Sequence, residues 1–208
     1  MAQQVLKPTT RPMPKGKIRY EQFLEWLDED TWAEWVDGEV ILMSPVSEKH
    51  QDVGRFLIAV LQFYITLHRL GVLRYEPFQM KTGADLPGRS PDILFVSQEH
   101  VDRLKPTYLD GPADLVVEII SPDSEERDRV HKFAEYERGG VCEYWLIDPH
   151  RRAAEFYVLG KDGKYVLRAQ GEAGEYHSAV LQGLRLRIEW LWALPPEIEV
   201  LKAWGIIA

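Results

Sequence analysis

The apolar run Leu115-Val116-Val117-Glu118-Ile119-Ile120 restricts the possible folds of this chain more than any other stretch. A short apolar run that ends at Ser121-Pro122 is typical of a strand buried on both faces. This strand would hold one carboxylate, Glu118. A buried carboxylate is costly unless a cation, a metal ion or a proton neutralises it. The run therefore predicts the centre of a sheet together with a group that stabilises Glu118.

A second short apolar run, residues 93–96, begins directly after Pro91-Asp92. We expect the two runs to form neighbouring strands, which would bring the carboxylates of Asp92 and Glu118 together. Two carboxylates can share one hard divalent cation such as Mg²⁺ or Mn²⁺. Such an ion polarises a phosphoryl oxygen and lowers the pKa of a bound water. The pair therefore indicates a metal-dependent phosphodiesterase, although Asp92 could instead cap a turn after Pro91.

A helix is predicted from Asp123 to about Arg138, because Asp123-Ser124-Glu125-Glu126 has the form of a capping box and Gly139-Gly140 follows. On this helix Arg129, Lys132 and Tyr136 share one face, at spacings of three and four. Lys132 could therefore reach back over the strand that carries Glu118. We assign it the role of the catalytic lysine that orients the attacking water. The alternatives are a solvated helix lysine and a structural ion pair between Glu118 and Lys132 or Arg129.

The remaining sequence predicts an α/β (α+β) domain with a mixed central sheet flanked by helices and with peripheral hairpins. Asp37-Gly38 and Lys161-Asp162-Gly163 are typical hairpin turns, and Ser47 is a typical N-cap. We expect residues 1–17 to form a flexible basic arm and residues 18–208 a single domain. The expected elements, in order, are a helix (20–28), a hairpin around 37–38, a helix from Ser47 to Gly71, strands (72–80, 91–97), a polar connection (98–113), a strand (114–121), the helix already described, a strand (141–148) and a hairpin (153–159, 165–169).

The charge distribution argues against avid, non-specific binding of nucleic acid. The net charge is −8, and residues 1–20 contain five basic and no acidic side chains. The other 188 residues therefore contain 20 basic side chains and all 33 acidic ones. An acidic body binds phosphate backbones poorly, because that affinity comes largely from lysine and arginine. Local or catalytic contact with a nucleic acid remains compatible with this charge.

Several other classes of protein are disfavoured by the sequence. The chain has no apolar run long enough to span a membrane and no apolar segment of a signal peptide near residue 1. Cys142 is the single cysteine, which is compatible with a reducing compartment, so we expect a cytoplasmic protein. The six histidines have no close ligand spacing for structural zinc. A nucleophile elbow, a phosphate-binding Gly-Lys loop and a dinucleotide fingerprint are absent from the sequence.

The order of these motifs resembles a known family. Asp-Gly-Glu at 37–39, Ser-Pro at 44–45, His50, Arg-Ser-Pro-Asp at 89–92, Asp-Leu-Val-Val-Glu-Ile-Ile-Ser-Pro at 114–122, Lys132, Tyr136 and Gly-Val-Cys-Glu-Tyr-Trp-Leu-Ile-Asp-Pro at 140–149 follow in this order. The pattern resembles the Uma-type family of bacterial endonucleases, within the PD-(D/E)xK nuclease superfamily. The resemblance covers roughly residues 20–190. It implies a restriction-endonuclease-like fold.

The resemblance also implies roles for individual residues. Asp92 and Glu118 would bind Mg²⁺ or Mn²⁺, and Glu39 and His50 would line the same pocket. Apart from the resemblance, we expect Arg89, Arg129 and Tyr136 to support this site. Ile120 stands where the superfamily has a lysine two residues after the glutamate. Lys132 matches the position of a helix-borne replacement. By residue type alone, Glu39 could be a hairpin-edge carboxylate and His50 a residue satisfied by a local hydrogen bond.

From these observations we predict a metal-dependent endonuclease that hydrolyses phosphodiester bonds in DNA. The alternative is a catalytically inactive module of the same fold that binds metal, nucleic acid or a protein partner. The aromatic and apolar segment 191–208 covers the core or pairs with a second copy of the chain. We expect a homodimer, because symmetric dimers are the commonest oligomers and two sites could cut two strands.

Overall fold

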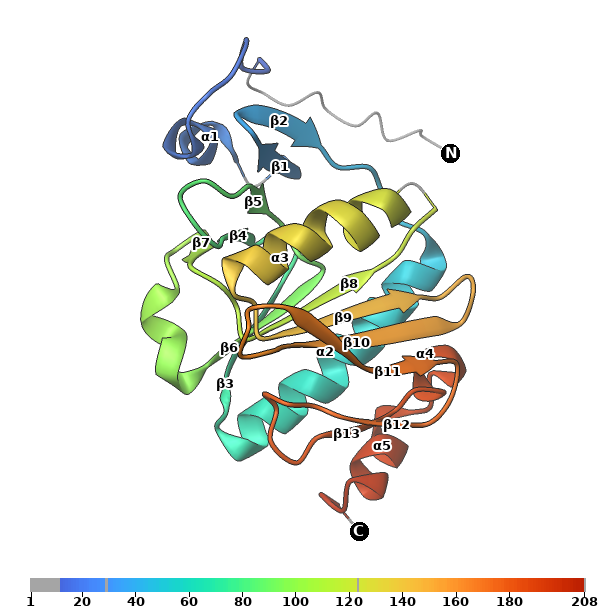
Figure 1. The fold of residues 1–208 in the computed structure, drawn as a ribbon. Helices are drawn as coiled ribbons and strands as arrows, with labels where there is room; N and C mark the ends of the chain where they lie inside the picture. The colour runs from blue at the N-terminus through green and yellow to red at the C-terminus, as the bar shows by residue number, and fades with distance from the viewer. Residues whose placement is uncertain (1–11, 29, 123, 208) are drawn as a thin grey trace.

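The computed structural model describes residues 12–28, 30–122 and 124–207 (Figure 1). Of the predicted basic arm, residues 1–11 lie outside the described residues, and residues 12–17 form no helix or strand. The helices are α1 (Tyr20–Trp26), α2 (Glu48–His68), the 3₁₀ helix η1 (Gln98–Arg103), the π-helix η2 (Arg127–Lys132), α3 (Phe133–Gly139), α4 (Trp190–Ala193) and α5 (Glu197–Ala203).

The strands form two larger sheets and a small hairpin. The six-stranded sheet has the order β11 (Tyr165–Gly171), β10 (Ala153–Leu159), β9 (Glu143–Asp148), β8 (Leu115–Ile119), β6 (Ile93–Ser97) and β3 (Gly71–Tyr75). The five-stranded sheet has the order β2 (Glu39–Leu42), β1 (Ala33–Val36), β5 (Gly88–Arg89), β4 (Gln79–Lys81) and β7 (Tyr108–Asp110). Strands β12 (Glu175–His177) and β13 (Arg185–Arg187) pair separately.

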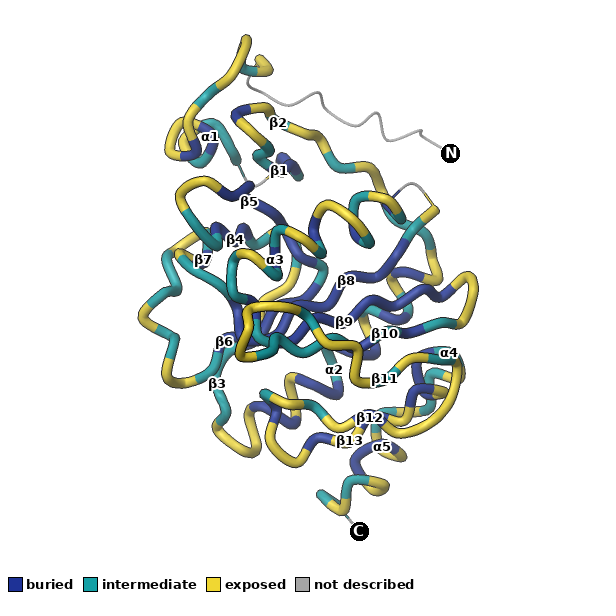
Figure 2. Tube along the Cα trace, viewed as in Figure 1, coloured by how far each residue is buried: buried dark blue, intermediate teal, exposed yellow. Residues whose placement is uncertain are grey.

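The six-stranded sheet is the centre of the molecule, with α2 on one face and α3 on the other (Figure 1). Strands β8 and β9 are parallel, and the other neighbours in this sheet are antiparallel. Alternate side chains of β8 point to opposite faces, as the pleat of a strand requires. Val117 and Ile119 pack under α2, whereas Val116 and Ile120 pack under α3. Figure 2 shows that these central strands are buried along their length.

The predicted pairing of the runs that follow Asp92 and contain Glu118 is confirmed. Strands β6 and β8 are antiparallel neighbours in which Ile93 lies opposite Val117. The hairpin predicted at Asp37-Gly38 is also confirmed, and both residues have positive φ, as a tight turn between twisted strands requires. Together with the buried sheet between helices, these elements confirm the predicted mixed α/β class.

The predicted continuous strand over residues 72–80 is wrong. Proline cannot donate a backbone hydrogen bond to a ladder, and the chain leaves the six-stranded sheet before Pro77 and enters the five-stranded sheet at β4. It returns between β5 and β6, through Ser90-Pro91-Asp92. The two crossings lie side by side, because the backbone N–H of Glu76 donates to the carbonyl of Asp92 at 3.2 Å. Carboxylates from distant parts of the chain therefore meet where the two sheets join.

Both predicted long helices differ from the observed helices in detail. Helix α2 begins after Ser47, whose side chain accepts from the backbone N–H of His50, as predicted. It ends at His68 with Arg69 in the left-handed conformation, and not at Gly71. Gly71 instead begins β3, where a Cβ would lie 2.1 Å from the carbonyl oxygen of Val96. This close approach between strands explains why the position holds glycine.

The single helix predicted over residues 123–138 contains a π-helical segment, η2, ahead of α3. Asp123 of the predicted capping box lies outside the described residues. The polar connection predicted over residues 98–113 contains η1 and the short strand β7. Propensity and periodicity carry little signal for such short elements.

The segment from α4 to Ile206 packs on the core beside α2. This segment therefore covers the core, which is one of the two alternatives that the sequence left open. Leu191 and Val200 are buried there, and Trp192, Trp204 and Ile206 pack against the same cluster. Across the described ranges, the helices lack the combination of length and hydropathy needed to cross a bilayer.

Candidate active site

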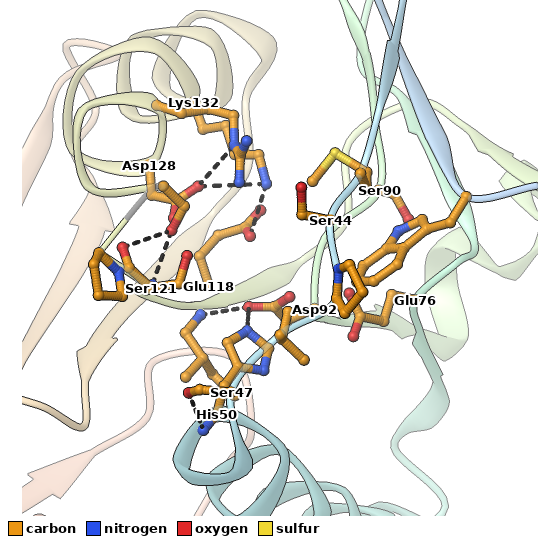
Figure 3. A pocket seen from close by; sticks show the side chains of 18 of the residues that line it. Ser44, Ser47, His50, Glu76, Ser90, Asp92, Glu118, Ser121, Asp128 and Lys132 are labelled. Carbon is orange, nitrogen blue, oxygen red and sulfur yellow. Dashed lines mark hydrogen bonds and ion pairs between the residues drawn. The ribbon is translucent and has the colours of Figure 1, made fainter. Parts of the chain in front are cut away.

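A pocket of about 320 Å³ opens where the two sheets meet the N-terminal end of α2 and the helix η2 (Figure 3). It contains the predicted residues His50, Asp92, Glu118 and Lys132. Its other walls are the segment after β2, the start of α2 and the loop after β8. The remaining lining residues are Trp32, Leu42, Met43, Ser44, Pro45, Val46, Ser47, Glu76, Ser90, Ile119, Ser121, Pro122, Ser124, Arg127 and Asp128.

Asp92 is held by groups from two other elements. Its Oδ2 accepts from the backbone N–H of Ile119 at 2.5 Å and lies 3.2 Å from Nε2 of His50. Burial lowers the pKa of His50, but the hydrogen bond and charge of Asp92 outweigh this effect, so the pKa is raised. The side chain of Asp92 is 13% exposed, so it borders the pocket while its position is fixed.

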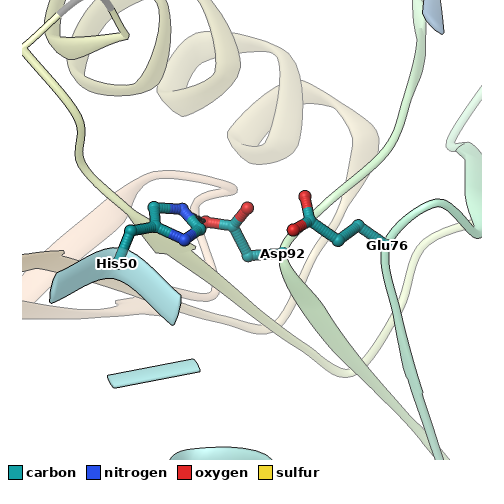
Figure 4. Close-up of side chains that lie close together, drawn as sticks. All are labelled: His50, Glu76 and Asp92. Atoms are coloured by element: carbon teal, nitrogen blue, oxygen red, sulfur yellow. Dashed lines mark hydrogen bonds and ion pairs between the residues drawn. The ribbon is translucent and has the colours of Figure 1, made fainter. Parts of the chain in front are cut away.

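Glu76 is a site residue that the sequence analysis missed. Within the described part of the chain, His50, Glu76 and Asp92 form one group of three possible metal ligands, with ligand atoms within 4.8 Å of one another. Figure 4 shows the three side chains converging. Burial, reinforced by the charge of Asp92, raises the pKa of Glu76 to about 8. Its Oε2 is buried and has no hydrogen-bond partner among the described residues. A cation in this position would stabilise the ionised carboxylate.

Glu118 and Lys132 form a buried pair, each with 2% of the side chain exposed. Lys132 Nζ lies 2.8 Å from Glu118 Oε2, and the hydroxyl of Tyr136 donates to Glu118 Oε1 at 2.7 Å. Lys132 therefore reaches over the strand that carries Glu118, as the helical spacing predicted. Ile120, which occupies the superfamily's lysine position, packs under Tyr136 in the core.

Carboxylates outnumber cations around Lys132. Its Nζ also lies 3.4 Å from Glu34 and 3.5 Å from Asp128, and both are buried. Burial disfavours the ammonium, but the surrounding carboxylates outweigh this and raise the pKa of Lys132. Burial raises the pKa of Glu118 well above its ordinary value, although Lys132 acts in the opposite direction. The lysine thus remains charged, while burial, reinforced by the charges of Asp92 and Asp128, raises the pKa of Glu118.

Arg89 supports this group from the side of the five-stranded sheet. It donates to Glu34 at 2.9 Å and makes a bidentate contact with Glu135 of α3, both bonds being 2.7 Å. The backbone N–H of Ser90 donates to the second oxygen of Glu34. Burial raises the pKa of Glu34, but Lys132 and Arg89 outweigh it, so that pKa is lowered. The ionised Glu34 therefore links β1, β5 and η2 beneath the pocket.

Four predicted residues do not line the pocket: Arg89 and Tyr136 bond to Glu34 and Glu118 beside it, whereas Glu39 and Arg129 lie apart from it. Glu39 is exposed on β2 and does not line the pocket; Glu34, on the other strand of the same hairpin, contacts Lys132 instead. Val36 pairs with Glu39, so Glu34 and Glu39 lie on the same face of the hairpin, but β2 is the edge strand of its sheet whereas β1 lies next to β5. Arg129 contacts Glu155 on β10 and Glu125, so it faces away from Glu118.

Unsatisfied polar atoms are concentrated at this pocket. Among the described residues, nine buried side-chain nitrogen or oxygen atoms have no hydrogen-bond partner, and six of these belong to lining residues. They are Trp32 Nε1, His50 Nδ1, Glu76 Oε2, Ser90 Oγ, Arg127 Nε and Asp128 Oδ1. Buried polar groups without partners are uncommon in native proteins and call for an explanation such as a bound ligand.

Glu143 shows what a purely structural buried carboxylate looks like in the same molecule. Its two oxygens accept five hydrogen bonds, from Trp145 Nε1, Tyr176 OH, Ser178 Oγ and the backbone N–H groups of Ala179 and Val180. Protein donors therefore satisfy Glu143 completely. Glu76, with a buried oxygen that receives no hydrogen bond, lacks such a set.

Comparisons with known proteins identify a family and a similar fold. The model of the Uma2 family, described as "Putative restriction endonuclease", matches residues 20–189. A crystal structure titled as a "putative nuclease belonging to DUF820" from Anabaena variabilis has the same fold, with a TM-score of 0.69 and 18% sequence identity. The alignment covers 85% of this chain and 98% of that one. Among curated proteins, none matches this chain.

Proposed function

We propose a divalent-metal-dependent nuclease function for this chain, which belongs to the Uma2 family of putative restriction endonucleases. The proposed reaction is hydrolysis of phosphodiester bonds in DNA. The observation that carries the proposal is the convergence of His50, Glu76 and Asp92 in one pocket with Glu118 and Lys132. Hard oxygen ligands beside a buried lysine suit phosphoryl chemistry.

The residues present fit a divalent cation such as Mg²⁺ or Mn²⁺. Asp92 and Glu118 remain our proposed ligands, and Glu76 and His50 join them because they converge on Asp92. Burial of Glu76 Oε2 and the raised pKa of Glu76 are consistent with a carboxylate that a bound cation would stabilise. When bound there, the ion would polarise a phosphoryl oxygen and activate a water.

Lys132 is the residue that we propose to orient the attacking water. Of its three carboxylate contacts, only that with Glu118 is a hydrogen bond; those with Glu34 and Asp128 are longer. N–H groups of the ammonium are therefore available to a water or a phosphoryl oxygen in the pocket. Its positive charge would offset the negative charge that develops on the phosphoryl group. Glu34 and Tyr136 would act as positioning residues.

Cleavage of supercoiled plasmid and of circular single-stranded DNA tests the function. Purified protein should cut at least one of them with Mg²⁺ or Mn²⁺ and not with a chelator. Cleavage should be lost in Asp92→Ala and in Glu118→Ala. Cleavage that persists in both variants would identify a contaminant. A folded protein that binds Mn²⁺ but cuts neither DNA would support the alternative of an inactive binding module, which the deep burial of the Lys132–Glu118 pair favours.

Binding of Mn²⁺ should tighten as the pH rises. Glu76 must lose its proton to bind the ion, and its pKa is about 8 in the ion-free protein. Between pH of about 6.5 and about 8.5 we expect the Kd to fall roughly twenty-fold. Isothermal titration calorimetry would measure it. In Glu76→Gln, binding should be weaker and its pH dependence smaller. An unchanged pH dependence in this variant would argue against Glu76 as a ligand.

We also propose a homodimer, because symmetric dimers are the commonest oligomers of soluble proteins. Sedimentation equilibrium would measure the mass directly. A single species at the 24.1 kDa of one chain would exclude the dimer.

A further inference from the structure

We propose that this nuclease takes its substrate as single-stranded DNA and that a base next to the scissile phosphate stacks on Tyr75. This inference rests on the proposed nuclease function and adds to it the form of the substrate. It comes from the depth of the pocket, from a second hollow on the other side of Asp92, and from the exposure of Tyr75.

The proposed catalytic groups are recessed below the surface. The exposed fraction of the side chain is 2% for both Glu118 and Lys132 and 5% for His50. The segment from Leu42 to Ser47 forms one wall of the pocket above them. A base-paired duplex holds its phosphodiesters on a stiff, regular backbone, whereas a single strand can splay its bases and bend into a narrow site. The recess therefore favours a single strand.

The possible metal ligands can be approached from two sides. His50, Glu76 and Asp92 line the pocket already described, and they also line a second hollow of about 520 Å³. Residues of α2 and Tyr75 form the rest of that hollow, together with Ile119. A strand could thus pass across these ligands with one nucleoside in each hollow. A blind cavity for a small metabolite would not require the second opening.

Tyr75 stands at the side of the second hollow, next to Glu76. Strand β3 ends at Tyr75 and forms the edge of the six-stranded sheet. Of the aromatic side chains in the described ranges, only Phe63 and Tyr75 are exposed, and Tyr75 is 55% exposed. Tyr75 also lines a third hollow, with Arg74 and Phe78. A tyrosine of the surface could serve solubility alone, but this one adjoins a possible metal ligand, and an exposed ring there offers a stacking platform.

Stacking is the source of affinity that suits an acidic protein. The net charge is −8, so binding cannot depend on many contacts between cations and phosphates. The two hollows that Tyr75 lines each contain one arginine, Arg55 and Arg74. Arg55 is 62% exposed in its side chain although it pairs with Glu197. Base stacking on an aromatic ring depends little on charge and tolerates any base.

The test uses one fluorescein-labelled DNA oligonucleotide, offered single-stranded and as a duplex with its complement. With Mn²⁺, wild type should cleave the single strand at least about ten-fold faster than the duplex. Tyr75→Ala should raise KM for the single strand roughly ten-fold, the scale of base–aromatic stacking, with little change in kcat. Tyr75→Phe should behave as wild type, because its ring still stacks. Phe63→Ala, at the other exposed aromatic residue, is the matched control and should also behave as wild type.

Binding separates this inference from the proposed function. Fluorescence anisotropy with wild type and Ca²⁺ in place of Mn²⁺ should show tighter binding of the single strand than of the duplex, and weaker binding by Tyr75→Ala. If that pattern is found without cleavage under any condition, the nuclease proposal fails and the Tyr75 subsite stands. Equal binding of both forms, or an unchanged Kd in Tyr75→Ala, would overturn the subsite whatever the cleavage result. A ribonucleotide strand of the same sequence that binds and is cleaved better would overturn DNA as the substrate.

Discussion

Asp92→Ala is expected to lower metal-dependent cleavage on the order of 10²- to 10³-fold, the scale on which loss of one preorganised electrostatic contact lowers kcat. Asp92 contacts elements on both sides of the pocket, through the N–H of Ile119 and through His50. Its removal would take a proposed ligand from the cation and leave His50 without its partner. Single-turnover cleavage of labelled DNA at saturating Mn²⁺ would measure the effect.

Asp114→Ala is a closely matched control for this substitution. Asp114 also accepts from a backbone N–H, that of Ser97 at 2.7 Å, and from a histidine, His100 at 2.8 Å. It lies outside the pocket. Asp114→Ala should therefore lower the melting temperature by a similar amount while cleavage remains. An Asp92→Ala protein that is folded and still cleaves at the rate of Asp114→Ala would remove Asp92 from the mechanism.

The sequence predicted those parts of the site that follow from a local sequence pattern. An apolar run around Glu118, an apolar run after Asp92 and a helical spacing at Lys132 each indicate an element and a face. Only the pairing of β6 with β8 is then needed to bring Asp92 and Glu118 into one pocket, and the position of Lys132 follows from the return of η2 and α3 over the sheet. The fold class followed from the same buried runs.

The residues that were missed depend on the junction between sheets. Glu76 follows a strand in which Tyr75 pairs with Ile93, so the next pair in that register is Glu76 with Asp92. A carboxylate directly before proline at the end of a strand was the available signal. Glu34 and Glu39 lie on the same face of the β1–β2 hairpin, and the choice between them depends on which of the two strands joins the rest of the five-stranded sheet. That order is set by pairing with β5, which is distant in sequence, and local pattern does not contain it.

Lys132→Met is expected to destabilise the fold by about 3–5 kcal/mol, the range for breaking a buried ion pair by removing one partner. The methionine would fill a similar volume, so the main cost is electrostatic. Glu118 would lose the cation that lies at hydrogen-bond distance from it, and Glu34 and Asp128 would lose a nearby one. Urea unfolding at equilibrium would measure the loss. A change below about 1 kcal/mol would show that this buried pair contributes as little to stability as an exposed ion pair does.

The pH dependence and a double variant separate the electrostatic cost from a packing defect. Burial already raises the pKa of Glu118, and loss of Lys132 removes a group that lowers it. A carboxyl whose folded pKa exceeds its unfolded pKa costs stability as the pH rises above the unfolded value. The deficit of Lys132→Met should therefore be smaller at pH of about 5 than at about 8.

Lys132→Met/Glu118→Gln should recover part of the stability, because a neutral amide replaces the unpaired carboxylate, yet it should remain inactive. If the double variant recovers stability but remains inactive, the pair takes part in the chemistry. If the loss of stability in Lys132→Met is the same at both pH values and Glu118→Gln does not relieve it, the loss comes from packing.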